Sequence, residues 1–455
     1  MSSPSRRNFL KKTAVGASLA AAPSLAQTGA GDTVNVAVVG IHGRGRTHYR
    51  EYAKMPGVRI SYLCDIDERL FPDALDWIEE NAGYRPKTHF DFRKLIEESD
   101  VDAVSVATPD HWHALHAIWA CQAGKDVYVE KPVSYTIQEG RRMVEAARKY
   151  DRIVQVGLNR RSNPRTQAAM ELLRSGGFGD VYRGKAIIYK GRASIGREKE
   201  ASIPEGVHWD LYLGPAPYRA YNINRFHYGW HFFWDTSTTD MGNSGVHNLD
   251  VVRWGMNKNQ HPAKVHCFGG VYVWDSDQQT PNVQNASFEY DDGTIMEAEL
   301  TNLFTPPMDG IRSIGDFFYT SRGYVSSAKG WHAVRGEFTP SKRSGSAGVD
   351  ETMASAGFPD RKYFDGPEIA APEGEAVSHF ANFIAIVRSR RREDLHCDIL
   401  EGHMSTTLCH LANISYRTGR KLTFDPATET FPGDDEANSY LTREYRKPYV
   451  LPDEV

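Results

Sequence analysis

The chain has 455 residues, enough for about two or three domains, and an ordinary globular composition with 25% charged and 11% aromatic residues. Its formal net charge of −4 excludes the strongly basic surface that a nucleic-acid-binding protein presents. The five cysteines are odd in number and widely scattered, which excludes a disulfide framework, and none has the spacing of metal ligands.

The first 26 residues have the form of a twin-arginine export signal. Ser5-Arg-Arg-Asn-Phe-Leu-Lys11 supplies the basic pair, an apolar stretch runs from Thr13 to Ala26, and Ser24-Leu-Ala26 offers a cleavage site. The apolar stretch is too short to span a bilayer. We expect residues 1–26 to be removed. The mature chain is then expected to be soluble, without a stable membrane anchor, and periplasmic or otherwise extracytoplasmic after export in the folded state.

From about Asp32 to Val156, short apolar runs of strand length alternate with segments of helical length. The apolar runs are Val34–Val39, Val58–Leu63, Ala103–Ala107, Asp126–Val129 and Ile153–Val156. Alternating strands and helices favour a parallel sheet with helices on both faces. Residues 32–156 therefore predict a doubly wound Rossmann domain in an α/β protein, with ligands at the carboxyl ends of the strands.

A glycine-rich turn with the spacing G-x-x-G-x-G follows the first apolar run. Glycine lets the backbone turn tightly and approach a phosphate, and the following helix offers its N–H groups and positive end. The turn therefore predicts a cradle for the pyrophosphate of a dinucleotide. The residues expected to form it are Gly40, His42, Gly43, Arg44 and Gly45.

A carboxylate is expected at the ribose of the same cofactor. Asp65 ends the second apolar run, about 20 residues after Gly45, where an acidic residue binds the ribose hydroxyls of NAD. It would repel a 2′-phosphate, so NAD is the expected cofactor. NADP stays possible because Arg44, Arg46 and Arg69 could compensate for that repulsion.

Two further stretches follow strands of the predicted sheet. Glu130-Lys-Pro132 places Lys131 as an acid or base in the same crevice as the phosphate cradle. The other stretch runs into a helix that contains three histidines, His111, His113 and His116. Three histidines at these offsets do not easily converge on a metal ion, so cofactor contact is favoured and no metal site is expected.

The segment Tyr218–Trp234 is crowded with aromatic residues. Such rings stack on the C–H faces of sugars while polar neighbours bind hydroxyls, but they also form cores and subunit interfaces. Both interpretations stay open for the segment, with His231 and Trp234 as candidates for substrate contact.

These motifs resemble those of the Gfo/Idh/MocA oxidoreductases, the family of glucose–fructose oxidoreductase and inositol dehydrogenase. The resemblance rests on the Gly40 loop, Cys64-Asp-Ile-Asp67, Thr108-Pro-Asp-His-Trp-His113, Glu130-Lys-Pro132 and Gly157-Leu-Asn-Arg-Arg161. It implies a Rossmann domain followed by a C-terminal α/β domain with an open, mainly antiparallel sheet. Substrate would bind between them, with Lys131 near the nicotinamide. The further cofactor contacts expected are Thr108, Pro109, His113, Glu130 and Asn159, and Arg160 is expected to contact the substrate.

The family's second catalytic motif, D-x-G-x-H-x-x-D, corresponds here to the stretch 243–250. Asn243 replaces the first aspartate of the motif. An asparagine can position a hydroxyl but cannot take a proton, so the family's Lys–Asp–His mechanism does not carry over directly, and Asp240 is the candidate substitute. The expected catalytic residues are Lys131, His247, Asn243 and Asp250, with His247 also contacting the substrate.

Residues 157–455 are expected to form a substrate-binding and oligomerisation domain. Apolar runs predict strands at Asp180–Tyr189, Val265–Trp274, Asn285–Tyr290, Thr294–Leu300 and Arg312–Tyr319. From about residue 329 to residue 375 the chain is rich in Gly, Ser and Pro, which predicts an irregular insertion or lid. The resemblance implies pairing of open sheets, so a homo-oligomer is expected.

Three functions stay open. The first is an NAD(P)-dependent oxidoreductase acting on a sugar or sugar derivative, with a tightly bound cofactor because free NAD is scarce outside the cytoplasm. The second is an NAD-dependent, redox-neutral glycosidase or epimerase that acts through a keto-sugar, as some members of the family it resembles do. The third is a non-catalytic sugar-binding protein that has kept the fold.

Overall fold

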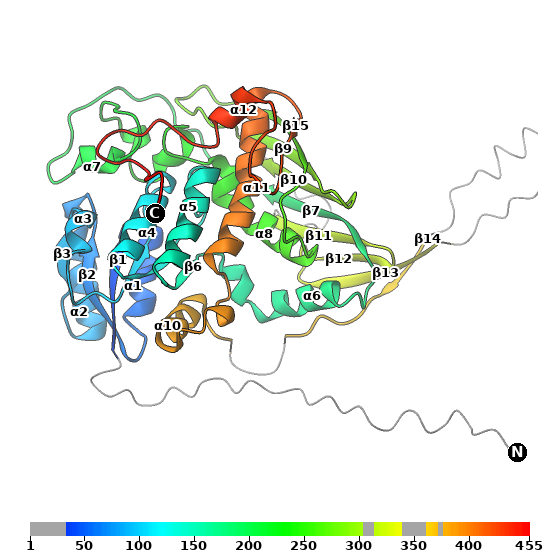
Figure 1. The fold of residues 1–455 in the computed structure, drawn as a ribbon, viewed down its shortest axis with the longest axis horizontal. Helices are drawn as coiled ribbons and strands as arrows, with labels where there is room; N and C mark the ends of the chain where they lie inside the picture. Colours follow the sequence, from blue (N-terminus) through cyan, green and yellow to red (C-terminus); the bar gives the residue numbers. More distant parts are fainter. Residues whose placement is uncertain (1–32, 304–313, 339–360, 372–375) are drawn as a thin grey trace, which may run out of the picture.

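A computed structural model describes residues 33–303, 314–338, 361–371 and 376–455. They form two sheets with helices packed around them (Figure 1). The expected signal, residues 1–26, lies outside the described residues. None of the helices in the described residues is both long and apolar enough to cross a bilayer. The five cysteines are buried, and each is a free thiol.

The first sheet has six parallel strands in the order β3-β2-β1-β4-β5-β6. They are β1 (Val34–Val39), β2 (Val58–Cys64), β3 (Lys87–His89), β4 (Ala103–Val106), β5 (Asp126–Val129) and β6 (Val154–Val156). The connecting helices are α1 (Arg44–Tyr52), α2 (Phe71–Ala82), α3 (Phe92–Leu95), α4 (Asp110–Gln122) and α5 (Ile137–Lys149). The predicted Rossmann sheet is confirmed, and its strand order reverses between β1 and β4, where such folds bind ligands.

Burial explains why these strands are recognisable as unbroken apolar runs. Every residue of β4 and β5 is buried, because helices cover both faces of the sheet. Several of the helices begin at side-chain N-caps. Helix α5, for example, starts after Thr136, whose hydroxyl accepts a hydrogen bond from the Glu139 N–H at 3.2 Å.

The second sheet has nine strands in the order β14-β13-β12-β11-β7-β10-β9-β8-β15. They are β7 (Val181–Tyr189), β8 (Lys264–Gly270), β9 (Val283–Glu289), β10 (Ile295–Thr301), β11 (Ile314–Thr320), β12 (Gly323–Ser326), β13 (His332–Phe338), β14 (Arg361–Asp365) and β15 (Leu422–Thr423). Strands β7 and β10 pair in parallel, whereas the other pairings are antiparallel. The predicted mainly antiparallel sheet is therefore confirmed.

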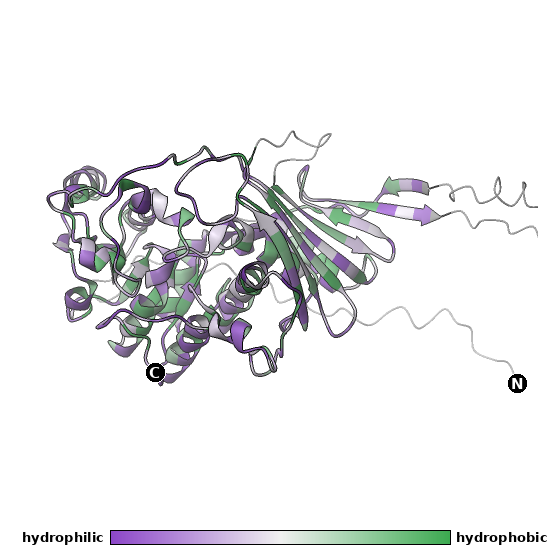
Figure 2. Ribbon diagram, turned by 90° about the horizontal axis from the view of Figure 1, so that it is seen from above, coloured by the Kyte–Doolittle hydropathy of each residue, from purple (hydrophilic) through white to green (hydrophobic). Residues whose placement is uncertain are grey.

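One face of the second sheet is covered by helices and the other is more exposed. Hydrophobic and hydrophilic residues alternate along its strands in Figure 2, and every second residue of β9 and β10 is buried. The helices after the first sheet are α6 (Pro164–Arg174), α7 (Trp209–Leu213), α8 (Val246–Gly255), α10 (His379–Ser389), α11 (Ile399–Thr418) and α12 (Asp435–Ser439). Helix α11 packs against α5 as well as against α8 and β8, so it joins the two sheets.

The segment from about residue 329 to residue 375 differs from its prediction. Part of it is regular, because β13 and β14 pair with each other and extend the second sheet, whereas residues 366–371 are irregular as expected. The rest of the segment, residues 339–360 and 372–375, lies outside the described residues. Regular strands escaped prediction because an edge hairpin buries little surface and therefore needs no apolar run.

Candidate functional site

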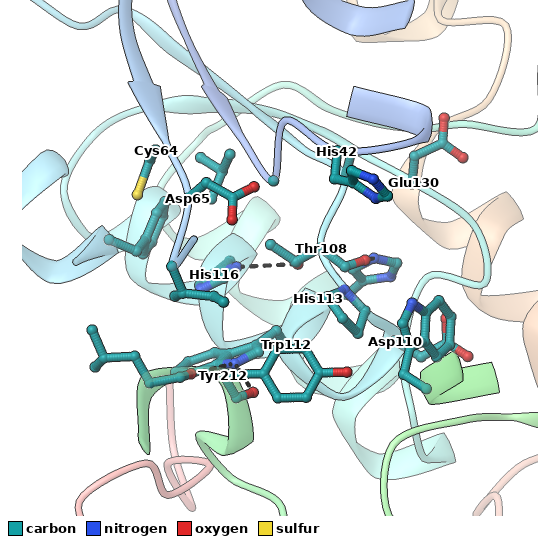
Figure 3. A pocket seen from close by; sticks show the side chains of 18 of the residues that line it. His42, Cys64, Asp65, Thr108, Asp110, Trp112, His113, His116, Glu130 and Tyr212 are labelled. Carbon is teal, nitrogen blue, oxygen red and sulfur yellow. Dashed lines mark hydrogen bonds between the residues drawn. The ribbon is translucent and has the colours of Figure 1, made fainter. Parts of the chain in front are cut away.

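A pocket of about 330 Å³ opens at the carboxyl ends of the first sheet's strands (Figure 3). Its opposite wall comes from residues 211–231 and from Tyr449, near the C-terminus. The expected cofactor residues that line it are Gly40, His42, Gly43, Arg44, Asp65, Thr108, Pro109, His113, Glu130 and Lys131. Asn243 and His231 line the same pocket, so cofactor and catalytic candidates share one crevice.

The glycine loop folds back on itself tightly. Gly40 has a φ of 78°, and a Cβ there would lie 2.8 Å from the carbonyl oxygen of Ala107. A Cβ at Gly45 would lie only 1.7 Å from the carbonyl oxygen of Gly40, so Gly45 supports the loop from beneath and does not line the pocket. A Cβ at Gly43 would meet nothing within 4 Å. Open space beside Gly43, directly before the first N–H groups of α1, fits a bound pyrophosphate.

Asp65 holds this loop in place as well as facing the pocket. Its Oδ2 accepts a hydrogen bond from the Ile41 N–H at 2.7 Å, and its Oδ1 accepts one from the Asp67 N–H at 3.0 Å. Burial raises the pKa of Asp65 to about 6. A carboxylate tied to the loop on one side and open to the pocket on the other suits the ribose of NAD.

Two of the arginines that could have accepted a 2′-phosphate are already paired. Arg69 donates to Asp67 through Nε and Nη2, both at 2.7 Å, and Arg44 Nε donates to Glu130 at 2.7 Å. A guanidinium that is neutralised by its own carboxylate attracts a further phosphate weakly. The described pocket therefore fits NAD better than NADP.

Glu130 is a buried counterion rather than an acid. Besides Arg44, it faces His48 Nε2 at 3.1 Å and accepts the backbone N–H of Lys131 at 3.2 Å. Although burial opposes the charged form, the partners His48 and Arg44 keep the pKa of Glu130 well below its usual range. Its role is to hold α1 against the turn that carries Lys131.

Lys131 and Asn243 are in direct contact. Lys131 Nζ donates to the carbonyl oxygen of Asn243 at 2.8 Å and lies 3.2 Å from its Oδ1. Asn243 belongs to the π-helical turn η5 (Met241–Gly245), and its Nδ2 donates to Asp240 at 3.1 Å. Asp240 is itself ion-paired with Arg192. Its link to Lys131 is indirect and runs through the hydrogen bonds of the Asn243 side chain. Burial lowers the pKa of Lys131, which favours the uncharged amine that can accept a proton.

His247 follows Asn243 by one turn, at the start of α8. Burial, and next the charge of Lys131, lower the pKa of His247 to about 3, so its ring is neutral. Its Nδ1 is buried and has no hydrogen-bond partner among the described residues. It is not one of the pocket-lining residues, so the predicted substrate contact of His247 is not supported by its position. A neutral ring can accept or donate one hydrogen bond but does not supply a positive charge.

The structure does not bring Asp250 to the pocket. Its carboxylate is buried against Arg161 Nη2 at 2.8 Å and accepts the Ser405 hydroxyl at 2.7 Å. Asp250 therefore joins α8 to α11 and to η2 (Asn159–Ser162). The catalytic role predicted for Asp250 is therefore not supported by its position.

We expect Asp250→Ala to lower the free energy of unfolding by about 3–5 kcal/mol, because it leaves the buried Arg161 guanidinium without that carboxylate. Urea unfolding of the variant measures the loss. The double variant R161M/D250A should recover part of it. A variant with unchanged stability and lost turnover would instead make Asp250 catalytic.

Three more candidates lie away from the pocket. Arg160 is ion-paired with the buried Asp316, and Asn159 is exposed. Trp234 stacks on Tyr416 at 6.2 Å and borders a different surface hollow. The substrate and cofactor contacts predicted for these three residues are not supported by their positions.

His113 does line the pocket, but its ring joins two loops. Its Nδ1 lies 2.7 Å from the carbonyl oxygen of Pro132, and its Nε2 lies 2.8 Å from that of Thr108. It therefore sets the turn carrying Lys131 against the turn after β4. His113 is best described as a positioning residue.

Asp110 is a pocket residue that sequence reasoning missed. It accepts the Thr238 N–H at 3.0 Å and the Thr238 hydroxyl at 2.6 Å. Burial raises the pKa of Asp110 to about 7, opposed by the hydrogen bonds and by the charge of Lys131. Its place in the Thr108–His113 motif was the available signal.

The far wall is aromatic and comes from remote segments. His227 lies 3.0 Å from Asp67, and its ring is 4.4 Å from that of His42, so this wall touches the glycine loop. His231 turns its Nδ1 to the Tyr228 carbonyl at 2.7 Å, and burial lowers its pKa to about 3. His231 is therefore neutral. The aromatic segment serves both the pocket and the core, because Phe226 and Phe232 are buried.

A glycine-loop cradle, a ribose carboxylate and a buried lysine in one crevice define a dinucleotide-dependent oxidoreductase. Two family descriptions match this chain: "Oxidoreductase family, NAD-binding Rossmann fold" over residues 34–158, and "Oxidoreductase family, C-terminal alpha/beta domain" over residues 185–310 and 368–451. Together they cover well over half of the chain. The protein belongs to the Gfo/Idh/MocA oxidoreductase family, and its first sheet is an NAD-binding domain.

Curated relatives match a smaller part of the chain. A glycosyl hydrolase family 109 protein from Shewanella baltica is 27% identical over 159 residues, which is 34% of this chain and 35% of that protein. A similar protein from Shewanella pealeana is 26% identical over the same length. The chain thus spans about a third of the length of these relatives.

Solved structures match the fold over nearly the whole chain. The WlbA dehydrogenase from Bordetella pertussis, in complex with NADH and UDP-GlcNAcA, has a TM-score of 0.61 at 18% identity, over 86% of this chain and 99% of that chain. Levoglucosan dehydrogenase, in complex with NADH and L-sorbose, has a TM-score of 0.61 at 15% identity, with the same coverage.

Proposed function

We propose that this protein is an NAD-dependent oxidoreductase acting on a sugar or sugar derivative, with a cofactor that stays bound between turnovers. The observation that carries the proposal is the contact of Lys131 with Asn243 in the pocket that holds the glycine-loop cradle. The solved neighbours in complex with UDP-GlcNAcA and with L-sorbose support the substrate class.

Bound NAD would supply the hydride acceptor at this site. Gly43 and the start of α1 would hold its pyrophosphate, and Asp65 its ribose. Lys131 Nζ, whose pKa is lowered by burial, would in its uncharged form accept the hydroxyl proton of the sugar as the carbon-bound hydride leaves. Asn243 holds Nζ by its two oxygens and so fixes the direction of the amine lone pair. The aromatic wall would exclude water and pack on the C–H face of the sugar.

The first test is to purify the protein without added cofactor, denature it and identify the released nucleotide. Stoichiometric NAD(H) is expected. Adding sugars to the intact protein should then change absorbance at the wavelength of reduced nicotinamide. A protein with no bound nucleotide and no activity with added NAD or NADP would contradict the proposal.

Asn243→Asp probes the proton transfer. The new carboxylate would contact Lys131 and raise the pKa of that lysine. Because only the uncharged amine accepts a proton, the rise of kcat with pH should move to higher pH, by about one unit or more. The pH–rate profiles of the native protein, N243D and N243Q measure this shift. An unmoved profile in N243D would exclude Lys131 as the base.

A second function is favoured by the family 109 relatives and by Asn243: a redox-neutral glycosidase that uses NAD. Transient oxidation of a sugar hydroxyl to a ketone acidifies the neighbouring C–H. Loss of the glycosidic group, addition of water and return of the hydride then give hydrolysis without net redox change. Release of sugar from nitrophenyl glycosides without added cofactor would support this function. No release from either anomer across a broad panel of glycosides would count against it.

Export and assembly are also proposals. We propose that residues 1–26 direct twin-arginine export of the folded, cofactor-loaded protein, supported by Ser5–Lys11. Replacing Arg6 and Arg7 by Lys in a reporter fusion should retain the reporter in the cytoplasm.

We further propose a homo-oligomer that pairs through the exposed face of the second sheet. Light scattering of the purified protein tests this assembly.

A further inference from the structure

The charged groups around Lys131 are mostly matched in pairs. Arg44 lies 2.7 Å from Glu130, Arg192 Nε lies 2.6 Å from Asp240, and Arg160 is paired with Asp316. Each of these three guanidinium groups has a carboxylate of its own. They therefore leave little free charge for a ligand.

Two ammonium groups have no carboxylate within ion-pair distance among the described residues. Lys131 Nζ contacts only the oxygens of Asn243, and Lys190 Nζ has a single described contact, the Ser244 hydroxyl at 3.4 Å. Asn243 and Ser244 are neighbours in η5, so the two lysines approach the same turn. Glu130 and Asp110 also act on Lys131, but Glu130 is already paired with Arg44, and burial raises the pKa of Asp110 to about 7, so Asp110 is only partly charged at neutral pH.

Asn243 increases this excess of positive charge around η5. An aspartate in its place would neutralise Lys131, whereas the amide leaves the charge of the site more positive by one unit. Lys131 must be uncharged to accept a proton, so in the reacting state the ammonium group left beside η5 is that of Lys190, whose nearest acidic influence, Asp240, is already paired with Arg192. Lys190 directly follows β7, and its backbone is fixed by a hydrogen bond from its N–H to the Thr301 carbonyl at 2.9 Å. Its side chain is exposed, and it lies beside the pocket-lining Asn243 rather than among the lining residues, so it can meet only a ligand group that extends beyond the pocket wall.

Resting on the proposed function, we propose that the sugar substrate is a uronic acid or a similar carboxylate-bearing sugar, and that Lys190 binds its carboxylate. A single ammonium matches a single negative charge. A phosphate carries more charge and is usually bound by arginine forks, and the nearby arginines are already engaged.

The test compares matched sugars on the cofactor-loaded protein: glucose with glucuronate, galactose with galacturonate, and mannose with mannuronate. Binding is followed by quenching of tryptophan fluorescence, since Trp230 lines the pocket, and turnover by reduction of the bound nucleotide. At least one uronate should bind about tenfold or more tighter than its neutral partner at low salt, and the preference should shrink as salt rises.

Lys190 variants assign the preference to this side chain. K190A should remove it, K190R should largely keep it, and K190E should reverse it. Lys185→Ala is the matched control, because Lys185 lies on β7, the strand that Lys190 directly follows, and is paired with Glu299 at 2.7 Å. It should leave the preference unchanged.

The outcomes separate the two proposals. Equal binding of neutral and acidic sugars with reduction of the nucleotide would overturn the uronate proposal and leave the oxidoreductase standing. A preference that survives in K190A would overturn the role of Lys190. No binding or reduction with any sugar of the panel would overturn both proposals.

Discussion

Lys131→Met should reduce turnover by about 10²–10⁴-fold while the protein keeps its NAD. Methionine retains the length and the apolar stem of the lysine but cannot accept a proton. The contacts to the Asn243 carbonyl and Oδ1 are lost with it, so nothing at that position takes the hydroxyl proton. Glu130, Asp65 and the glycine loop are untouched, which is why cofactor binding should survive.

The measurement is steady-state turnover together with the amount of nucleotide released on denaturation. Lys125→Met is the matched control, since Lys125 lies next to the opposite end of β5 and donates only to the carbonyls of Glu98 and Val101. It should cost stability but not turnover per folded molecule. Undiminished turnover in K131M would remove Lys131 from the mechanism, and loss of NAD would make it a binding residue.

Gly45→Ala should abolish cofactor retention and lower the free energy of unfolding by roughly 2–3 kcal/mol. The added Cβ would stand 1.7 Å from the carbonyl oxygen of Gly40, a backbone atom that cannot turn aside. The loop must open, and this movement also disturbs the hydrogen bond from Ile41 to Asp65. The cradle would then no longer match a pyrophosphate.

Nucleotide content and urea unfolding check this result. Gly336→Ala is the control glycine, because the nearest atom to its added Cβ is 3.9 Å away and the residue lies in β13, far from the pocket. It should keep both the nucleotide and the stability. A Gly45→Ala protein that purifies with a full complement of NAD would show that the loop does not hold the cofactor.

Much of the first domain was readable from sequence because its signals are local. Buried parallel strands must be apolar at every position, and a phosphate loop must contain glycine where the backbone folds on itself, as at Gly40 and Gly45. Lys131 could be placed in the crevice for the same reason, because the carboxyl end of a parallel strand has a known position relative to the loop. The edge strands β13 and β14 were missed, since they bury little surface.

The catalytic motif shows the limit of such reasoning. Asn243 does meet Lys131, but Asp250 from the same eight-residue motif is turned into a buried ion pair with Arg161. Asp250 fits the family pattern and Asn243 departs from it, yet Asn243 is the one that lines the pocket. Which side of α8 faces the pocket depended on where α11 and η2 pack, and neither is near α8 in sequence.

By itself, the sequence determined the NAD-binding fold, the cradle and the strand that presents Lys131, because each depends on residues close together in the chain. Only the tertiary structure decided that His227, His231 and Tyr449 close the same pocket, that Trp234 does not, and that Lys190 reaches the turn of Asn243 without a carboxylate of its own. These are tertiary contacts between segments up to several hundred residues apart in the sequence. They follow from the packing of the second sheet and its loops against the first, for which no local pattern carries a signal.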